Sequence, residues 1–292
     1  MELKALITGG LGFLGQHLTR RLKGDGHDVS VLDVKDNSGD VRDYESVKSA
    51  IRGVDTVFHL AAVVGVEQAS ANPIDVMDTE LIGIRNLVRA SVEKGVKRIV
   101  YASSSEIYGN RALLPMSESD SPSPLSSYGV SKLAVEHYLK AFGDKIESVS
   151  LRIFNAYGPG QDERFVVARF INQALKNEQI TVYDDGRQTR DFTYIDDVVE
   201  AFVLASGTKY LGEVFNVATG IQTRVISLAK IVKSATRSDS KIVLVRPSKR
   251  LPEFEVRKRT ASLLNSRKKL GFEAKTVLRD GIVKTITLRT RA

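Results

Sequence analysis

The sequence predicts an α/β fold, with a doubly wound parallel sheet and a smaller C-terminal lobe. Short apolar stretches recur at residues 3–8, 29–33, 55–61, 97–103 and 148–154, and segments with helical periodicity separate them. Strands that alternate with helices favour a parallel sheet covered by helices on both faces. The chain has 292 residues, 42% of them hydrophobic, which suits one large domain or two smaller ones.

The first predicted strand, residues 3–8, leads into a glycine-rich turn and then an amphipathic helix that ends at residue 24. The glycines are Gly9, Gly12 and Gly15. In a Rossmann-type fold the first permits a tight turn, the second lets the backbone approach a pyrophosphate, and the third lets the helix pack on the strand. Phe13 and Leu14 open the helix, and we include them among the expected cofactor contacts.

The second predicted strand ends at Asp33, about twenty residues beyond the glycines. A carboxylate there can accept hydrogen bonds from the adenosine ribose hydroxyls, and it would repel a 2′-phosphate. NAD is therefore favoured over NADP, although Lys35 nearby leaves that preference open. The alternative is a glycine-rich turn in an α/β protein that binds no dinucleotide.

The candidate catalytic residues follow the fourth predicted strand, and they are Ser104, Glu106, Tyr128 and Lys132. A free tyrosine has a pKa near 10, so only about one in a thousand is ionised at pH 7, a deficit of roughly 4 kcal/mol. Lys132 lies one helical turn after Tyr128 and can stabilise the phenolate that an alcohol oxidation needs. Ser104 would hydrogen-bond the reacting oxygen. A Tyr-x-x-x-Lys pair alone is weak evidence, because it occurs by chance in roughly every second chain of this length.

Together these residues resemble the extended short-chain dehydrogenase/reductase family, the NAD-dependent nucleotide-sugar epimerases and dehydratases. The resemblance covers nearly the whole chain. Beyond the Gly9-x-x-Gly12-x-x-Gly15 turn it includes six ordered motifs, at residues 39–43, 58–62, 103–109, 127–132, 151–160 and 185–192. The resemblance implies a Rossmann-type domain with a substrate-binding lobe, NAD as cofactor, and a nucleotide-diphosphate sugar, most simply a UDP-sugar, as substrate.

The resemblance also implies roles for single residues. The cofactor contacts that it adds to the glycine turn and Asp33 are Asp40, Val41, Leu60, Ala61, Ala62, Tyr128 and Lys132. The substrate contacts are Ser105, Asn155, Tyr183, Arg190 and Arg250. Arg190 is similar to an arginine whose guanidinium grips the diphosphate; otherwise it forms a surface ion pair with Asp191 or Asp185. Tyr183 packs either on a uracil or in the core of the lobe.

The implied reaction begins when Tyr128 takes a proton from the C4 hydroxyl and a hydride passes to NAD, which produces a 4-keto sugar. In a UDP-glucose 4-epimerase-like enzyme the hydride returns to the other face. In a 4,6-dehydratase or a UDP-glucuronate decarboxylase a further step follows, and Glu106 can act as its base. If Glu106 lies on a strand, its side chain shares a face with that of Ser104. A hypothesis from another class is a non-catalytic NAD-binding scaffold.

Two features depart from the family pattern. The family usually has asparagine where this chain has Glu80, and the role of that position is therefore open. Only six residues separate Asp33 from Asp40, where the family fits a helix and a third strand. A parallel crossover needs about a dozen residues, so we expect no strand there and the strand ending at Asp33 at or near an edge.

Composition and motif order complete the predictions. We assign residues 1–157 and 190–218 to the NAD-binding domain, and residues 158–189 and 219–292 to the lobe. The net charge is +8, but the basic tracts at residues 246–259 and 267–269 lack the aromatic residues that stack nucleic-acid bases, so we read them as solvated surface. With no cysteine and no ligand spacing among the four histidines, no metal site is predicted. The absence of a signal peptide or membrane span favours the cytoplasm, and the family pairs the helices at residues 79–94 and 127–142 in a homodimer.

Overall fold

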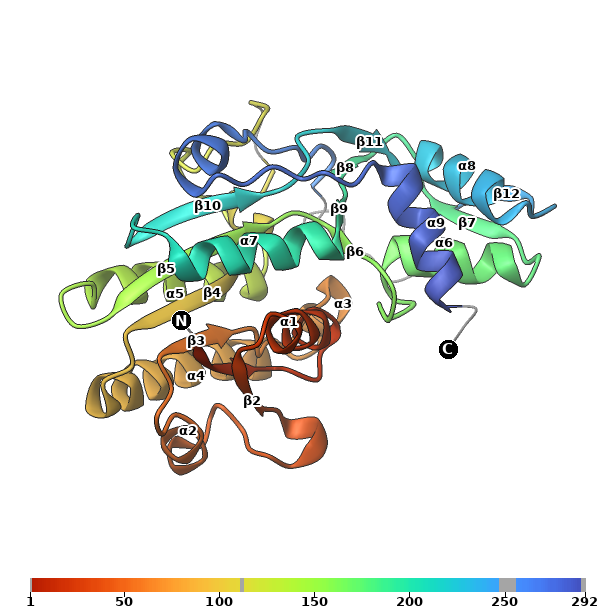
Figure 1. Cartoon of the computed structure of the whole chain (residues 1–292). Helices are drawn as coiled ribbons and strands as arrows, with labels where there is room; N and C mark the ends of the chain where they lie inside the picture. Colours follow the sequence, from red (N-terminus) through yellow and green to blue (C-terminus); the bar gives the residue numbers. More distant parts are fainter. Residues whose placement is uncertain (1, 111–112, 247–255, 290–292) are drawn as a thin grey trace.

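The structure, a computed structural model, describes residues 2–110, 113–246 and 256–289. Its main domain is built on a six-stranded sheet in the order β10-β5-β4-β3-β1-β2, with every neighbouring pair parallel (Figure 1). The strands are β1 (Lys4–Thr8), β2 (Asp28–Leu32), β3 (Thr56–His59), β4 (Arg98–Ser104), β5 (Glu147–Ile153) and β10 (Glu213–Val217). The predicted parallel α/β fold is confirmed, and each predicted strand lies within about two residues of an observed one.

Helices cover both faces of this sheet. One face carries α1 (Phe13–Gly24) and α7 (Ile195–Gly207); the other carries α2 (Tyr44–Ala50), α4 (Pro73–Lys94) and α5 (Ser127–Ala141). Successive side chains of a strand point to opposite faces: Ala5 and Ile7 pack with α1 and α7, whereas Leu6 packs with α2, α4 and α5. The alternation on β1 therefore builds two separate apolar cores, one on each face.

The connection after β2 is as short as the sequence predicts. A single 3-10 turn, η1 (Val34–Asp36), follows Asp33, and no strand forms between residues 36 and 43 of the described chain. The strand β2 is consequently the terminal strand of the sheet. This confirms that the usual third crossover is absent.

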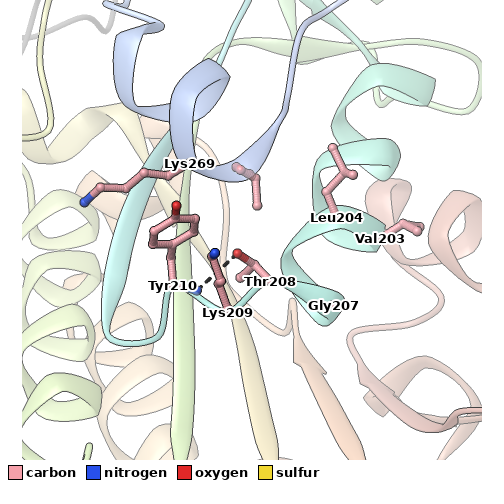
Figure 2. Close-up of a pocket in the computed structure, with 8 residues that line it drawn as sticks. Val203, Leu204, Gly207, Thr208, Lys209, Tyr210 and Lys269 are labelled. Atoms are coloured by element: carbon pink, nitrogen blue, oxygen red, sulfur yellow. Dashed lines mark hydrogen bonds between the residues drawn. The ribbon is translucent and has the colours of Figure 1, made fainter.

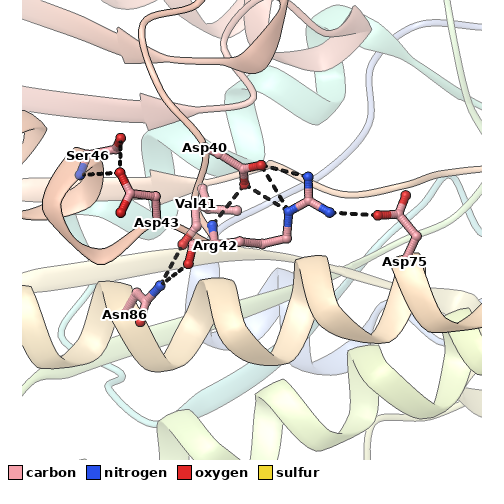
Figure 3. A network of polar contacts seen from close by, with 7 residues as sticks. All are labelled: Asp40, Val41, Arg42, Asp43, Ser46, Asp75 and Asn86. Atoms are coloured by element: carbon pink, nitrogen blue, oxygen red, sulfur yellow. Dashed lines mark hydrogen bonds and ion pairs between the residues drawn. The ribbon is translucent and has the colours of Figure 1, made fainter.

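Side-chain contacts hold the shortened connection against the helices, as Figure 3 shows. The Arg42 guanidinium bonds the Asp40 carboxylate at 2.6 Å and reaches Asp75 on α4 at 2.7 Å. The Asn86 amide donates to the carbonyl oxygens of Val41 and Arg42 at 3.0 and 2.9 Å. The loop is thus fixed by contacts with α4 and needs no sheet partner.

The smaller lobe pairs β7 (Ile180–Tyr183) with β12 (Ile242–Val245) in parallel, beside α6 (Val166–Leu175), α8 (Val225–Thr236) and α9 (Leu278–Arg289). Two further pairs join the segments between the domains: β8 (Thr189–Asp191) with β11 (Gln222–Arg224), and β6 (Ala156–Tyr157) with β9 (Thr193–Tyr194). Helix α7 begins at Ile195, because the preceding two residues pair with β6.

The C-terminal part of the chain does not stay in the lobe. After the lobe strand β12, a π-helical turn, η4 (Ser266–Leu270), contacts β10 and α7, and Leu270 and Phe272 are buried in the core of the main domain. Helix α9 then returns to the lobe and packs on α8. The remaining short helices are α3 (Val66–Ala71) and η2 (Ser105–Tyr108). None of the described helices is both long and apolar enough to cross a membrane.

Candidate active site

The glycine turn after β1 requires glycine at two of its positions. Gly9 has φ +70°, and a Cβ atom there would lie 2.8 Å from the backbone of Ala61. At Gly15 a Cβ atom would lie 2.3 Å from the carbonyl oxygen of Gly9, so α1 packs directly on the turn. Gly12 occupies the N-cap of α1, and no side chain caps it. The first amides of α1 are therefore available to an anion such as a pyrophosphate.

Asp33 supports this turn from the end of β2. Its Oδ2 accepts a hydrogen bond from the amide of Leu11 at 2.9 Å, and its Oδ1 accepts one from the amide of Lys35 at 2.9 Å. A carboxylate has about four lone-pair sites, so Asp33 can still accept the two ribose hydroxyls of a dinucleotide. The Lys35 ammonium donates to the Leu11 carbonyl at 3.1 Å. The turn, the open helix end and this acid together fit NAD.

The other predicted cofactor residues follow the carboxyl ends of β1, β2 and β3. The Thr8 hydroxyl accepts hydrogen bonds from the amides of Leu60 and Ala61, both at 3.3 Å, which holds the segment through Ala62 beside the glycine turn. Val41 is buried, and a Cβ atom added to Gly83 on α4 would meet it at 3.0 Å. The Asp40 carboxylate accepts a hydrogen bond from the Arg42 guanidinium at 2.6 Å. Phe13 and Leu14 pack against apolar residues of the lobe.

Ser104 is the last residue of β4, and the chain turns at once into η2. Its hydroxyl accepts a hydrogen bond from the Glu106 amide at 3.2 Å, which caps η2. Glu106 therefore lies on a 3-10 turn. The expectation that Ser104 and Glu106 share a strand face was wrong, because a serine that caps a helix ends the alternation of an extended strand.

Tyr128 lies in the first turn of α5, where Ser126 caps the helix. Burial raises the pKa of Tyr128; the Lys132 ammonium and a hydrogen bond with Ser104 lower it, while the Glu80 carboxylate raises it. The expected influence of Lys132 on the phenol is present, but the pKa of Tyr128 remains above its ordinary value because desolvation is the larger effect.

Lys132 is buried beside Tyr128, and its ammonium lies 5.4 Å from the centre of the phenol ring. The ammonium forms an ion pair with Glu80 at 2.7 Å and donates to the Ala102 carbonyl at 2.8 Å. The Tyr101 hydroxyl donates to the other oxygen of Glu80 at 2.7 Å. Glu80, whose role the sequence left open, is thus the direct partner of the candidate catalytic lysine.

The structure adds a residue that the sequence did not indicate, Arg259. Its guanidinium forms an ion pair with Glu106 at 2.7 Å and donates a hydrogen bond to the Ser105 hydroxyl at 3.2 Å. The Arg259 side chain is only 4% exposed. The sequence placed Arg259 in a basic tract on the solvated surface, and this was wrong for Arg259. Since the two partners lie 153 positions apart in the sequence, no local pattern reveals this pair.

The predicted substrate residues come from several segments beyond β5. Asn155 follows β5, and its buried side-chain oxygen has no hydrogen-bond partner in the described structure. Arg190, in the middle of β8, donates to the Thr189 carbonyl at 2.8 Å. The Tyr183 ring stacks with the Arg169 guanidinium, 4.5 Å from the ring centre. Arg250 lies outside the residues that the structure describes.

Comparison with known proteins decides the family. A family model described as the NAD dependent epimerase/dehydratase family matches residues 5–218. The chain belongs to this family. The match begins in β1 and ends just after β10, so it spans the main sheet and both candidate catalytic segments. It confirms the resemblance on which the sequence-based assignment rested.

Individual members of the epimerase/dehydratase family are similar over most of their length. The chain is 34% identical over 271 residues to the UDP-N-acetyl-alpha-D-glucosaminuronate decarboxylase of Bacillus cytotoxicus, with 84% of each chain covered. The structure of a UDP-glucose 4-epimerase from Thermotoga maritima with UDP-glucose aligns with a TM-score of 0.92 and 32% identity, over 98% of each chain. A Thermus thermophilus UDP-glucose 4-epimerase in complex with NAD aligns with a TM-score of 0.89 and 31% identity, over 99% of this chain and 100% of that one.

Membership of the epimerase/dehydratase family makes the chain an NAD-dependent enzyme. The glycine turn and Asp33 are the residues that fit NAD, and Ser104, Tyr128 and Lys132 are present together beside them. A non-catalytic scaffold would not need this set of residues. The prediction of an enzyme with a Rossmann-type cofactor domain is confirmed.

A surface hollow of about 410 Å³ is lined by none of the candidate site residues (Figure 2). It is formed between the C-terminal end of α7 and η4, and it includes Lys209, Tyr210 and Lys269. The segment that lines it leads into the start of β10, whereas the glycine turn and Ser104 follow the carboxyl ends of β1 and β4. Ligands of open α/β sheets bind at the carboxyl ends, so this hollow is not part of the candidate active site.

Proposed function

We propose that this enzyme is a nucleotide-sugar 4-epimerase that acts on a UDP-sugar through transient oxidation at C4. The proposal is supported by the family, by similarity to UDP-glucose 4-epimerases over nearly the whole chain, and by the arrangement of Ser104, Tyr128 and Lys132. The main alternative is a lyase, either a 4,6-dehydratase or a UDP-glucuronate decarboxylase, and the decarboxylase of Bacillus cytotoxicus keeps that alternative open.

We base the choice between an epimerase and a dehydratase on the ion pair between Glu106 and Arg259. In a 4,6-dehydratase Glu106 would act as a base, which must take up the proton from C5 of the sugar, whereas a decarboxylase loses carbon dioxide from C6 and needs no such base. In this chain a buried guanidinium holds the Glu106 carboxylate at 2.7 Å. Protonation of Glu106 would leave the Arg259 charge buried without its counter-charge, which is strongly unfavourable. The pair therefore disfavours proton abstraction at C5, and with it the dehydratase; the choice between the epimerase and the decarboxylase depends on which substrate the enzyme converts.

In this proposal the residues of the chain have distinct tasks. Tyr128 takes the proton from the C4 hydroxyl and later returns one, Ser104 hydrogen-bonds the C4 oxygen, and Lys132 stabilises the phenolate. NAD, when bound, supplies the hydride acceptor and donor. The glycine turn, Asp33, Asp40 and Val41 would hold NAD. Ser105, Asn155, Tyr183, Arg190 and Arg250 would hold the UDP-sugar, with Arg190 on the diphosphate.

We expect UDP-glucose to be converted to UDP-galactose in deuterated water with no deuterium bound to carbon in the sugar, because the hydride never exchanges with solvent. Nuclear magnetic resonance of the product measures both the conversion and the label. Glu106→Gln, which keeps size but removes the base, should reduce the rate by no more than about tenfold if Glu106 only positions groups. Deuterium at C5 that is lost in the variant, or release of carbon dioxide from UDP-glucuronate, would instead establish a lyase.

We also propose a homodimer built on α4 and α5, which pack together on one face of the sheet. Both helices carry exposed apolar side chains, among them Val92 and Val130. Light scattering at micromolar concentration should therefore give twice the monomer mass. Val130→Glu is expected to weaken the dimer, because a buried unpaired charge at an interface is unfavourable; a wild-type protein that is monomeric under these conditions contradicts the proposal.

A further inference from the structure

We infer that Glu80 is a positioning residue that fixes the Lys132 ammonium beside Tyr128 and offsets part of its charge there, so that the enzyme works in a more alkaline pH range than it would with asparagine at this position. The inference rests on the proposed role of Tyr128 as the base. It assigns a function to the residue at which this chain departs from the pattern of its family.

Two polar contacts hold the buried side chain of Glu80 in place. Its side chain is completely buried in the middle of α4, and Lys132 is 1% exposed. One carboxylate oxygen lies 2.7 Å from the Lys132 ammonium, and the other accepts the Tyr101 hydroxyl at 2.7 Å. Helix α4 thus places a negative charge beside the Lys132 ammonium, where asparagine would place a neutral amide.

This ion pair leaves Lys132 able to perform its expected tasks. An ammonium has three donor hydrogens. One is donated to the Ala102 carbonyl, and the ammonium lies 2.7 Å from Glu80 in an ion pair, so at least one donor hydrogen remains for a ligand. Two fixed partners define the position of the ammonium, whereas a lysine side chain alone has four flexible bonds. Glu80 therefore orders Lys132 before the cofactor and the substrate bind.

The surrounding groups leave Glu80 as the principal counter-charge. The titratable groups that face Lys132 and Tyr128 are Glu80 on α4, Tyr101 on β4, His59 on β3, Glu106 on η2 and Glu136 on α5.

Burial and Lys132 lower the pKa of His59 to about 3, so this ring is neutral at pH 7. Burial and Glu80 raise the pKa of Tyr101, which is neutral as well. Glu136 and Glu106 are paired with Arg152 and Arg259. Among the described residues, only Glu80 is paired with Lys132 itself, and its charge opposes formation of the phenolate.

Glu80→Asn tests the inference by two measurements. In the pH profile of kcat/KM, the acidic limb should move down by about one pH unit, so that well below the limb the variant is about tenfold faster than the wild type. The same shift should appear without substrate, in the ultraviolet absorbance of tyrosinate during titration of the NAD-bound protein. Tyr128→Phe protein, titrated in parallel, isolates the signal of this one tyrosine.

Asp197→Asn is the control, because it also removes a buried carboxylate, but one on α7, on the opposite face of the sheet, that accepts the amides of Lys275 and Thr276. It should leave the position of the limb unchanged. Glu80→Gln repeats the test with a longer amide. An acidic limb and a tyrosinate titration that stay in place, or that move up, would overturn the inference, as would failure of both Glu80 variants to fold. Absence of turnover in the wild type, with the tyrosinate shift still present, would reject the epimerase and leave the inference intact.

Discussion

Tyr128→Phe should lower turnover by about a thousandfold or more while NAD stays bound. The phenyl ring can still pack at the start of α5, but it has no oxygen to take the proton from the substrate. General acid–base catalysis contributes about a hundredfold to ten-thousandfold, and Lys132 and Ser104 would then have no phenolate to support. Retention of more than about a tenth of the wild-type rate would mean an effect below 1.4 kcal/mol, too small for a base.

The measurement is the rate of UDP-sugar conversion, with bound NAD quantified by mass spectrometry of the purified protein. Tyr138→Phe is a suitable control, because Tyr138 lies on the same helix and packs against Phe142 at a distance of 4.9 Å between ring centres. It should leave the rate within about twofold of the wild type. Loss of bound NAD from the Tyr128 variant would show that the Tyr128 hydroxyl is needed to bind the cofactor, and the loss of turnover would then be no evidence for proton transfer.

Lys132→Met should lower the free energy of unfolding by about 3 to 5 kcal/mol at pH 7, because it leaves the completely buried Glu80 without its counter-charge. Methionine fills much the same volume, so the loss is electrostatic. The isolated carboxylate would bind a proton more readily in the folded than in the unfolded chain. Stability of the variant should therefore fall as the pH rises, and lowering the pH should restore part of it.

Denaturant unfolding at several pH values measures this effect. The double variant Lys132→Met with Glu80→Gln should recover most of the lost stability, because no buried charge then remains unpaired. Lys97→Met removes an exposed lysine whose ion pair with Asp55 spans 3.4 Å, and it should cost no more than about 1 kcal/mol. Equal losses for the single and the double variant would show that Lys132 stabilises the fold by packing and not by charge.

The features that could be predicted from the sequence are local ones. Strand positions, the glycine turn and the short link from Asp33 to Asp40 depend on spacing and on the conformational preferences of nearby residues, and the structure confirms them. The expectation that Glu106 shares a strand face with Ser104 was wrong because two local rules compete after Ser104. Alternation favoured a continued strand, whereas a serine hydroxyl that accepts the Glu106 amide favours a helical turn, and the turn is what forms.

The features that could not be predicted are contacts between distant segments. Glu80 and Lys132 come from different helices, and Arg259 reaches Glu106 from beyond the lobe strands. A charged side chain has no sequence pattern that reveals whether its partner is water or a residue on another element. Arg259 was grouped with surface charges for this reason, and its burial follows only from the path of the chain back toward η2.

The short link after β2 also has a consequence for solubility. As the terminal strand, β2 directs one row of backbone amide and carbonyl groups outward, and such a row is a template on which other chains can aggregate. Two features limit this hazard. The strand has only five residues, and it begins with the exposed Asp28, whose charge would repel a second copy of the same edge. Loss of a whole crossover thus exposes an edge that is short and carries a charge, and both properties limit its pairing with other chains.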